Sequence, residues 1–316
     1  MKFLVSGVGG DIGQSIANIL SGYYCEAEIF GSDIHNDFFP GDIYKDIKLL
    51  PPVTSPAYID RLSEYLAKEK INIFIPTSEA ELRWFVDGDV DLNSLPSHCL
   101  MASSKAMKIG FDKFLTSQHL AANGLPAPWV SLASHSDLGA PEIPCILKSR
   151  AGSGNSSVFY IDDYEKSICF QRAFPGYIWQ QFLPLSSGEF TCGVYRCLDG
   201  STRVIAMRRR LSSGVTSFAH VVNNPLIETL CVNIAESLDL FGSINVQLRL
   251  VDNDVPMVFE INPRFSSTVG MRHAIGFSDV IWSIEEQFLR QKVSPCPSAW
   301  PDVKLGRRYQ ELCKYE

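Results

Sequence analysis

Two neighbouring segments with regularly alternating side chains, 243–251 and 255–262, most constrain the fold of this chain. Successive side chains of an extended strand point to opposite faces of a sheet, so such alternation is typical of strands with one polar face. A tight turn at 252–255, with Asn253 and Asp254 as a two-residue loop, would join the two strands. The sequence therefore predicts an antiparallel hairpin in the last third of the chain.

The loop fixes which residues face each other across the hairpin: Asp252 and Val255, Gln247 and Glu260, and Asn245 and Asn262. The amide and carboxylate side chains of the last two pairs then lie on one face. The opposite face is apolar and consists of Ile244, Val246, Leu248, Phe259 and Ile261. A slip by one residue would send Gln247 to the apolar face, so the register is sharply specified.

Glu260 and Asn262 bring a carboxylate and an amide oxygen to the same face of the second strand. Two oxygen ligands side by side suit a hard cation such as Mg²⁺ (or Mn²⁺). Arg264, just beyond, could bind a phosphate that the metal also holds, through its planar fork. An isolated Glu-x-Asn strand is more often a solvated edge strand, so this alternative stays open here.

A second informative segment, 144–160, predicts a strand ending at Lys148, a Gly/Ser loop and another strand. Gly152 and Gly154 would let backbone N–H groups approach a phosphate closely, and Ser153 adds a hydroxyl donor. The loop is no Walker A motif, because no Gly-Lys-Ser/Thr closes it and no helix follows at once. Taken alone, such a segment is more often an ordinary hairpin connection.

The N-terminal segment, 1–17, predicts a strand, a glycine turn and a helix. Its glycines approximate the dinucleotide-binding fingerprint: Gly7, Gly9 or Gly10, and Gly13. Asp33 ends the next strand, as an NAD site requires, but Asp11 stands at the helix N-terminus and would repel a pyrophosphate. The glycines are therefore interpreted as structural turn residues, with an NAD(P) oxidoreductase as the alternative.

Strands alternate with helices through about residue 100, which predicts a doubly wound parallel sheet. The expected strands are 3–6, 28–32, 47–49, 73–76 and 99–102, connected by helices near 12–20, 57–68 and 80–85. Beyond this sheet, we expect a helix at 112–123, a small mixed unit to about 174, and an antiparallel sheet with helices at 225–240 and 277–290. The fold class is thus α/β followed by α+β.

Composition excludes several classes of protein. The 316 residues suffice for two domains, and the net charge of −7 argues against nonspecific nucleic-acid binding. No apolar run approaches the length of a membrane span, and the N-terminus has no signal-peptide pattern. The nine cysteines are scattered without metal-ligand spacing, which is typical of a reducing compartment, so a cytoplasmic protein is expected.

Taken together, these motifs resemble the ATP-grasp superfamily, most closely its carbamoyl-phosphate synthetase large-subunit and biotin-carboxylase-like branch. The resemblance runs from about residue 1 to about residue 290. It implies a Rossmann-like pre-ATP-grasp domain and a two-lobed ATP-grasp domain, followed by a C-terminal tail. The implied ranges are 1–102, 103–290 (lobes at about 103–175 and 176–290) and 291–316. Alternatively, residues 291–316 would form a contact between the two subunits of a homodimer.

The same resemblance implies how the nucleotide is bound. Lys113 and Lys148 match the two phosphate-contacting lysines of the family, and the loop that carries Gly152, Ser153 and Gly154 matches the one that closes over the nucleotide. The segment that holds adenine by its backbone corresponds to Gln180, Gln181, Phe182 and Leu183.

The remaining implied roles concern ribose, metal and the transferred phosphate. Glu189 matches the acid that bonds the ribose, and Arg264 matches the arginine at the transferred phosphate. The metal ligands correspond to Gln247, Glu260 and Asn262. Among the arginines of 208–210, the family pattern favours Arg210 near the γ-phosphate.

The function that the resemblance implies is an ATP-dependent ligase with Mg²⁺ (or Mn²⁺). Such an enzyme would join a small-molecule carboxylate to an amine through an acyl phosphate, releasing ADP and phosphate. The alternatives are phosphorylation of bicarbonate or carbamate in the manner of carbamoyl-phosphate synthetase, a noncatalytic nucleotide-binding protein, and the NAD(P) oxidoreductase. We expect neither a nucleic-acid nor a membrane partner.

Overall fold

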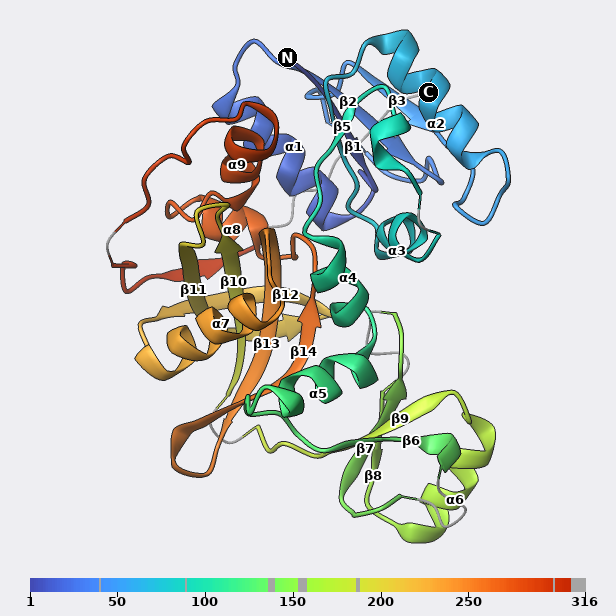
Figure 1. Ribbon diagram of the computed structural model, residues 1–316, viewed down its shortest axis with the longest axis vertical. Helices are drawn as coiled ribbons and strands as arrows, with labels where there is room; N and C mark the ends of the chain where they lie inside the picture. Colours follow the sequence, from blue (N-terminus) through green and yellow to red (C-terminus); the bar gives the residue numbers. More distant parts are fainter. Residues whose placement is uncertain are drawn as a thin grey trace.

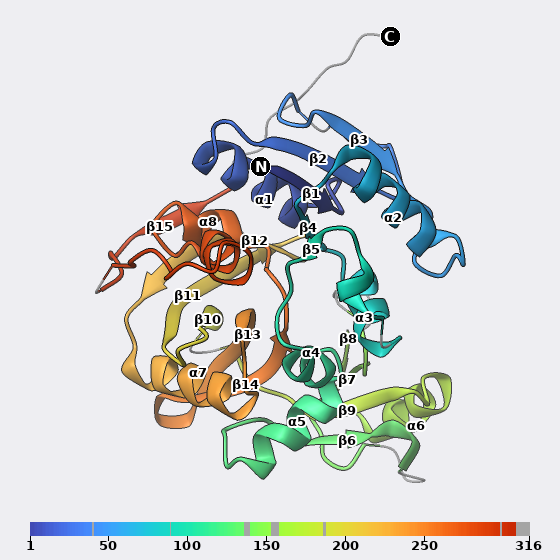
Figure 2. The same cartoon turned by 45° about the horizontal axis from the view of Figure 1, so that its top comes forward.

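The computed structural model describes residues 1–39, 41–88, 90–135, 140–152, 158–185, 188–297 and 299–307. The strands of these residues form three sheets. The N-terminal sheet and the smallest sheet lie at opposite ends of the molecule, and the largest sheet lies between them (Figure 1). Figure 2 shows the same order after a rotation of 45°. The expected fold class, a parallel α/β unit followed by α+β lobes, is confirmed.

The N-terminal sheet is parallel throughout and has the strand order β3-β2-β1-β4-β5. Its strands are β1 (Lys2–Ser6), β2 (Glu28–Asp33), β3 (Asp46–Leu49), β4 (Ile73–Ile75) and β5 (His98–Cys99). The connecting helices are α1 (Asp11–Tyr23), α2 (Tyr58–Glu69) and α3 (Glu79–Asp87), with a 3₁₀ turn at Leu92–Ser94. The strands and helices predicted from the alternating pattern are all present, although β5 lies earlier than the predicted 99–102.

The smallest sheet is antiparallel, with the strand order β6-β9-β7-β8. It consists of β6 (Val130–Leu132), β7 (Cys145–Ser149), β8 (Val158–Ile161) and β9 (Tyr177–Gln181), and α6 (Tyr164–Ala173) follows β8. Trp179 and Leu147 are fully buried in a cluster to which aromatic side chains of α6 and β8 add. This cluster makes the sheet a stable wall for the adjacent cavity.

The largest sheet has the order β14-β13-β10-β11-β12-β15 and is antiparallel. Its strands are β10 (Glu189–Arg196), β11 (Thr202–Ser212), β12 (Val215–Val222), β13 (Gly242–Val251), β14 (Val255–Asn262) and β15 (Lys304–Gly306). One face packs against α4 (Ser104–Gly110), α5 (Lys113–Ala122) and α7 (Pro225–Ser237).

The opposite face of the largest sheet packs against the last part of the chain. There, α8 (Val269–His273) and α9 (Asp279–Ser283) precede a π-helical turn at Ile284–Phe288, so the helix expected at 277–290 is shorter and changes its winding. Trp300 is buried and β15 pairs with β12. The segment expected as a tail thus contributes an edge strand to this sheet.

The hairpin β13–β14 has the predicted register where its polar residues lie. Asn245 pairs with Asn262 and Gln247 pairs with Glu260. The turn differs from the prediction, because Val251 pairs with Val255 and the three residues between them form a 3₁₀ turn. A β-bulge at Phe259 compensates for the longer turn and restores the register.

The bulge corrects the predicted apolar face of the hairpin. Phe259 was expected in the core with Leu248 and Ile261, but Val258 occupies the core instead. Phe259 lies on the other side and lines a cavity. The extra residue of a bulge turns the strand locally, which a strict alternation of faces does not anticipate.

Candidate functional site

A cavity of about 510 Å³ lies between the smallest and the largest sheet. Its charged lining residues come from α5, β7, β10, β11, β13 and β14, and they are Lys113, Lys148, Glu189, Arg209, Arg249 and Glu260. Four cationic side chains therefore face two carboxylates. A cavity with this excess of positive charge favours a polyanionic ligand.

Most residues predicted from the sequence to bind nucleotide or metal line this cavity: Lys113, Lys148, Gly152, Gln180, Gln181, Phe182, Leu183, Glu189, Gln247 and Glu260. Asn262, Arg264 and Arg210 are not among its lining residues. Ser153 and Gly154 lie outside the described residues. Nothing in the structure tests the individual roles, which stay predictions.

The two lysines approach the same carboxylate from different elements. Lys113, the first residue of α5, lies 3.9 Å from Glu260 and donates to the carbonyl of Gly152 at 2.5 Å. Lys148 donates to the carbonyl of Phe259 at 3.2 Å. Because Phe259 is the bulged residue, it has no paired residue on β13, and its carbonyl accepts from side chains of the opposite lobe.

Burial changes the acidity of Lys148. Its side chain is only 6% exposed, and desolvation lowers its pKa to about 8, with the cations of Lys113 and Arg249 adding to the effect and Glu260 opposing it. A buried ammonium with this pKa gains from an anion that would share its site.

Glu189 is held by two arginines from the neighbouring strands. In the sheet register it pairs with Arg209 on β11 and with Arg249 on β13. Arg209 donates Nε and Nη2 to Oε1 at 3.0 and 2.7 Å, and Arg249 donates Nε and Nη2 to Oε2 at 3.1 and 2.8 Å. Burial opposes ionisation, but the two guanidinium groups lower the pKa of Glu189 below its usual value.

The predicted adenine segment begins in β9 and is fixed from both sheets. Gln180 donates its amide to the carbonyl of Phe259 at 3.4 Å, and Arg249 donates to the carbonyl of Leu183 at 2.5 Å. The ring of Phe182 lies edge-on to Tyr160, with centroids 5.0 Å apart. The backbone of this segment is therefore held in place at the cavity edge.

The oxygen donors for a metal are few. Glu260 and Asn262 share a face of β14, and the amide oxygen of Gln247, which accepts from Arg209 at 2.8 Å, keeps a second lone pair for a cation. Within the described ranges, no group of three His, Cys, Asp or Glu side chains could hold a metal ion. One carboxylate and two amides fit a Mg²⁺ ion that brings its other oxygen ligands with water and a phosphate.

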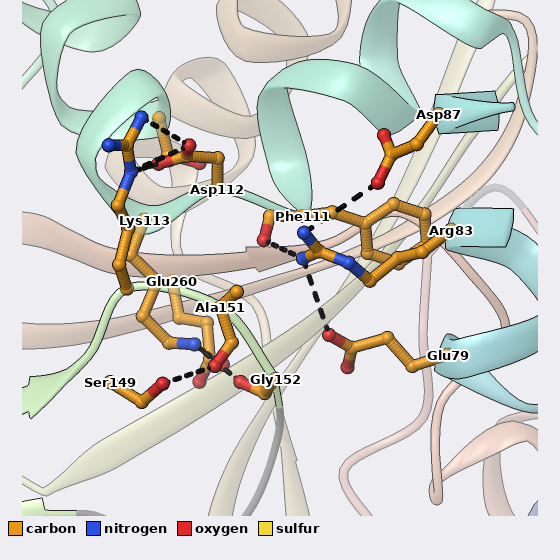
Figure 3. A network of polar contacts seen from close by, with 12 residues as sticks. Glu79, Arg83, Asp87, Phe111, Asp112, Lys113, Ser149, Ala151, Gly152 and Glu260 are labelled. Atoms are coloured by element: carbon orange, nitrogen blue, oxygen red, sulfur yellow. Dashed lines mark hydrogen bonds and ion pairs between the residues drawn. The ribbon is translucent and has the colours of Figure 1, made fainter. Parts of the chain in front are cut away.

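Contacts around α5 connect the cavity to the N-terminal sheet (Figure 3). Asp112 caps α5 and forms an ion pair with Arg150 at 2.7 Å, while Lys113 next to it points toward Gly152 and Glu260. From α3, Arg83 donates to the carbonyl of Phe111 at 2.6 Å.

Three further arginines are not among the residues that line this cavity. Arg264 donates to the carbonyl of Phe265 at 3.0 Å. Arg210 is exposed and its guanidinium lies over the ring of Phe218, 5.4 Å from the centroid. Arg272 is fully buried in an ion pair with Asp279 at 2.6 Å.

The carboxylates near the glycine turn of the N-terminal sheet make contacts within the protein itself. The carboxylate of Asp33 accepts from the backbone N–H of Gly9 and of Ile34, both at 2.8 Å, and so stabilises the turn itself. Asp11, at the first position of α1, pairs with Arg307 at 2.9 Å. These contacts favour the structural interpretation of the glycines.

Sequence reasoning missed Arg209 and Arg249 as cavity residues. Arg249 could have been found, because it lies two positions after Gln247 and must share its face of the strand. Arg209 could be identified only from the pairing of β11 with β10, which the tertiary structure shows.

Comparisons with known proteins agree with this architecture. A protein-family model described as an ATP-grasp domain matches residues 111–268, half of the chain. A search of curated proteins found no match. None of the helices in the described ranges combines the length and apolar character that a membrane span requires.

Several solved structures are similar in fold. An ADP complex of purK, an N5-carboxyaminoimidazole ribonucleotide synthetase, has a TM-score of 0.71 at 15% identity, covering 92% of this chain and 77% of that one. An L-amino acid ligase from Bacillus licheniformis has a TM-score of 0.67 at 19% identity, with 87% and 69% covered. A biotin carboxylase from Campylobacter jejuni has a TM-score of 0.67 at 14% identity, with 87% and 68% covered.

Proposed function

Since the chain belongs to the ATP-grasp family, we propose that this ATP-grasp ligase joins a small-molecule carboxylate to an amine through an acyl phosphate and releases ADP and phosphate. The observation that carries the proposal is the cavity between the two lobes, where four cations surround the polar residues of the hairpin. Its charge excess and its position between two sheets suit the phosphates of ATP.

The chemistry follows from the poor reactivity of a carboxylate toward amines. Phosphorylation converts a carboxylate oxygen into a phosphate leaving group, which the amine then displaces. Phosphoryl transfer needs mainly positioning and neutralisation of charge. Lys113 and Lys148 lie where they would offset the charge of the transferred group, and the lobes would exclude water that hydrolyses the acyl phosphate.

A divalent metal fits beside the same residues. Gln247, Glu260 and Asn262 would hold Mg²⁺ (or Mn²⁺), which when bound supplies further neutralisation of phosphate charge. Arg264 follows these residues directly on the chain. Its predicted contact with the transferred phosphate belongs to this proposal.

The relatives support a ligase that uses a carboxylate and an amine. One similar structure is that of an L-amino acid ligase. Phosphorylation of bicarbonate or carbamate remains the alternative, and the presence of a biotin carboxylase among the similar structures is its support. Assays with bicarbonate as the sole acid separate the two.

The test is ADP release by purified protein in mixtures of amino acids, other carboxylates and amines. We expect ADP formation that needs both an acid and an amine, and a loss of at least about 100-fold in the variant Glu260→Ala. The exposed residue Glu64 offers the matched control, since Glu64→Ala removes a carboxylate far from the cavity. Turnover retained in Glu260→Ala, with an unchanged melting temperature, would contradict the proposed role of Glu260 as a metal ligand.

A further inference from the structure

The ion pair between Arg150 and Asp112 joins the end of β7 to the start of α5. Arg150 donates Nε to both carboxylate oxygens of Asp112, at 3.0 and 2.8 Å, and its Nη2 lies 2.7 Å from Oδ2. In the opposite direction, the backbone N–H of Lys113 donates to the carbonyl of Arg150 at 3.0 Å. Side chain and backbone thus connect the two segments, which leaves the turn before α5 little freedom relative to β7.

Asp112 binds the guanidinium and the helix at the same time. Its Oδ1 accepts from the backbone N–H groups of Phe114 and Leu115, at 2.9 and 3.1 Å, and so caps α5. Burial opposes ionisation, but Arg150 and these N–H groups lower the pKa of Asp112 below its usual value. The carboxylate is therefore charged at neutral pH and holds Arg150 against the start of the helix.

Lys113 occupies a position in which its charge is partly repelled. As the first residue of α5 it places a cation at the positive end of the helix dipole, and the cation of Lys148 acts on it from β7. Its side chain nevertheless points into the cavity, toward Gly152 and Glu260 (Figure 3). Because attraction and repulsion oppose each other here, the position of the ammonium depends on how firmly the backbone of the turn is held.

Neither Arg150 nor Asp112 is among the residues that line the cavity. The guanidinium of Arg150 lies over the ring of Phe114 on α5, 5.5 Å from the ring centroid. The same turn is also held from β14, because a Cβ added to Gly110 would lie 2.9 Å from the ring of Pro263. A contribution of the ion pair to nucleotide binding must therefore pass through the turn and the lysine that it carries.

We propose that Arg150 and Asp112 are positioning residues, whose ion pair fixes the turn that aims Lys113 at the phosphates of the nucleotide. The inference rests on the proposed function and deepens it. Without the ion pair the ammonium of Lys113 would still be present, but it would spend less time at the phosphates. The binding of ATP would then weaken, although neither residue of the ion pair touches the nucleotide.

The substitution Asp112→Asn separates positioning from charge. Asparagine also caps helices well, so α5 should stay folded, but its neutral amide cannot form the ion pair with Arg150. By charge alone, the loss of a carboxylate near the cavity should strengthen the binding of an anion. We expect the opposite result: calorimetry with Mg·ATP should give a dissociation constant about three- to tenfold higher than that of the wild type.

Asp163 provides the matched control. It caps α6 by accepting from the backbone N–H of Lys166 at 2.8 Å, is exposed and does not line the cavity. Asp163→Asn makes the same chemical change at a second helix cap and should leave the dissociation constant of Mg·ATP within about twofold of the wild type. Unchanged or tighter binding by Asp112→Asn would overturn the inference, and so would equal losses in the two variants.

The part of Arg150 is measured in an Arg150→Met background. There the ion pair is already absent, so a further Asp112→Asn change should raise the dissociation constant by less than about twofold. A further loss as large as in the wild-type background would show that Asp112 acts without Arg150, which overturns the proposed pair.

A Lys113→Met background distinguishes the positioning of Lys113 from a general support of the fold. No ammonium is left to aim, so Asp112→Asn should alter the dissociation constant by less than about twofold in this background. A loss as large as in the wild-type background would overturn the inference alone, because ATP would still bind. If the wild-type protein does not bind Mg·ATP, the proposed function fails, and the inference fails with it.

Discussion

Lys148 shows how the burial of one charged group links the cavity to pH. Its pKa of about 8 in the folded protein lies below the ordinary value of 10.5, because burial disfavours the ammonium. A bound polyphosphate would restore the charged form, so ATP binding takes up a proton wherever free Lys148 is neutral. ATP affinity is therefore expected to fall as pH rises above about 8.

The fall in ATP affinity should approach tenfold per pH unit, until Lys148 in the ATP complex itself begins to lose its proton. Calorimetric titrations from pH 7 to pH 10 measure the slope. Lys148→Arg is the matched variant, because arginine stays charged over this range and its slope should be close to zero. Equal slopes in the two proteins would contradict the assignment of the linkage to Lys148.

Glu81, on α3 beside the N-terminal sheet, has a pKa shifted in the opposite direction, and its titration affects the stability of the fold. It is fully enclosed, accepts from the hydroxyls of Ser6 and Tyr58, and has a pKa raised to about 7, mainly by burial. Between pH 4.5 and pH 7 the folded state keeps a proton that the unfolded state has lost. The stability that this proton contributes is complete below pH 4.5 and is lost as pH rises through 7.

The variant Glu81→Gln removes this dependence, because its amide does not titrate. Urea unfolding at pH 5 and pH 8 should show that the wild type loses up to about 3 kcal/mol more than the variant between the two values. A difference below about 0.5 kcal/mol would show that Glu81 titrates alike in the folded and unfolded states.

At the scale of elements, the packing of α1 on the glycine turn depends on one position. A Cβ added to Gly13 would lie 2.5 Å from the carbonyl oxygen of Gly7, so no side chain fits there without moving the backbone. Gly22, in the same helix, has nothing within 4 Å of such a Cβ. The two glycines form a matched pair within one helix.

Gly13→Ala is expected to destabilise the protein by about 2 kcal/mol, since the clash involves backbone atoms. Gly22→Ala should stabilise it by about 0.5 to 1 kcal/mol, because alanine is the better helix former. Urea unfolding of both variants measures the contrast. Similar free energies of unfolding for the two variants would refute the close packing at Gly13.

Local patterns account for much of the fold but not for the details of the site. Alternation and turn signals predicted the parallel sheet, and they gave the pairing of Gln247 with Glu260 correctly. The bulge at Phe259 could not be predicted, because a longer turn and a bulge compensate each other in register. Arg209 could not be selected over Arg210, because strand alternation does not say which face the neighbouring sheet will cover.

At the scale of the whole molecule, the N-terminal sheet shares its core with residues far away in the sequence. One hydrophobic cluster joins Phe3, Ile16 and Leu100 to Val269 and Ile281. This cluster covers the face of the sheet on which α1 lies, beside α8 and α9. Residues on both sides of position 102, the boundary that the family resemblance implies, therefore share one hydrophobic core.

Polar contacts cross the same boundary at several points. Arg307 pairs with Asp11 at 2.9 Å, and the hydroxyl of Tyr23 donates to Glu285 at 3.4 Å. Gln287 donates to the carbonyl of Met101 at 3.2 Å. Contacts between the beginning and the end of the chain thus reinforce the shared apolar cluster, and the N-terminal unit depends on them for part of its stability.

Cooperative unfolding follows from this arrangement. Residues 1–102 alone would expose the apolar residues of α1 that α8 and α9 cover, so we expect the isolated segment to remain unfolded or to aggregate. The intact chain should unfold in one calorimetric transition that includes the N-terminal sheet. A well-dispersed amide spectrum of the segment, or a separate transition for the sheet, would contradict the shared core.

The substitution Ile281→Ala, which removes a fully buried side chain at the junction, should lower the stability of the whole chain by about 2 to 5 kcal/mol and leave the transition single.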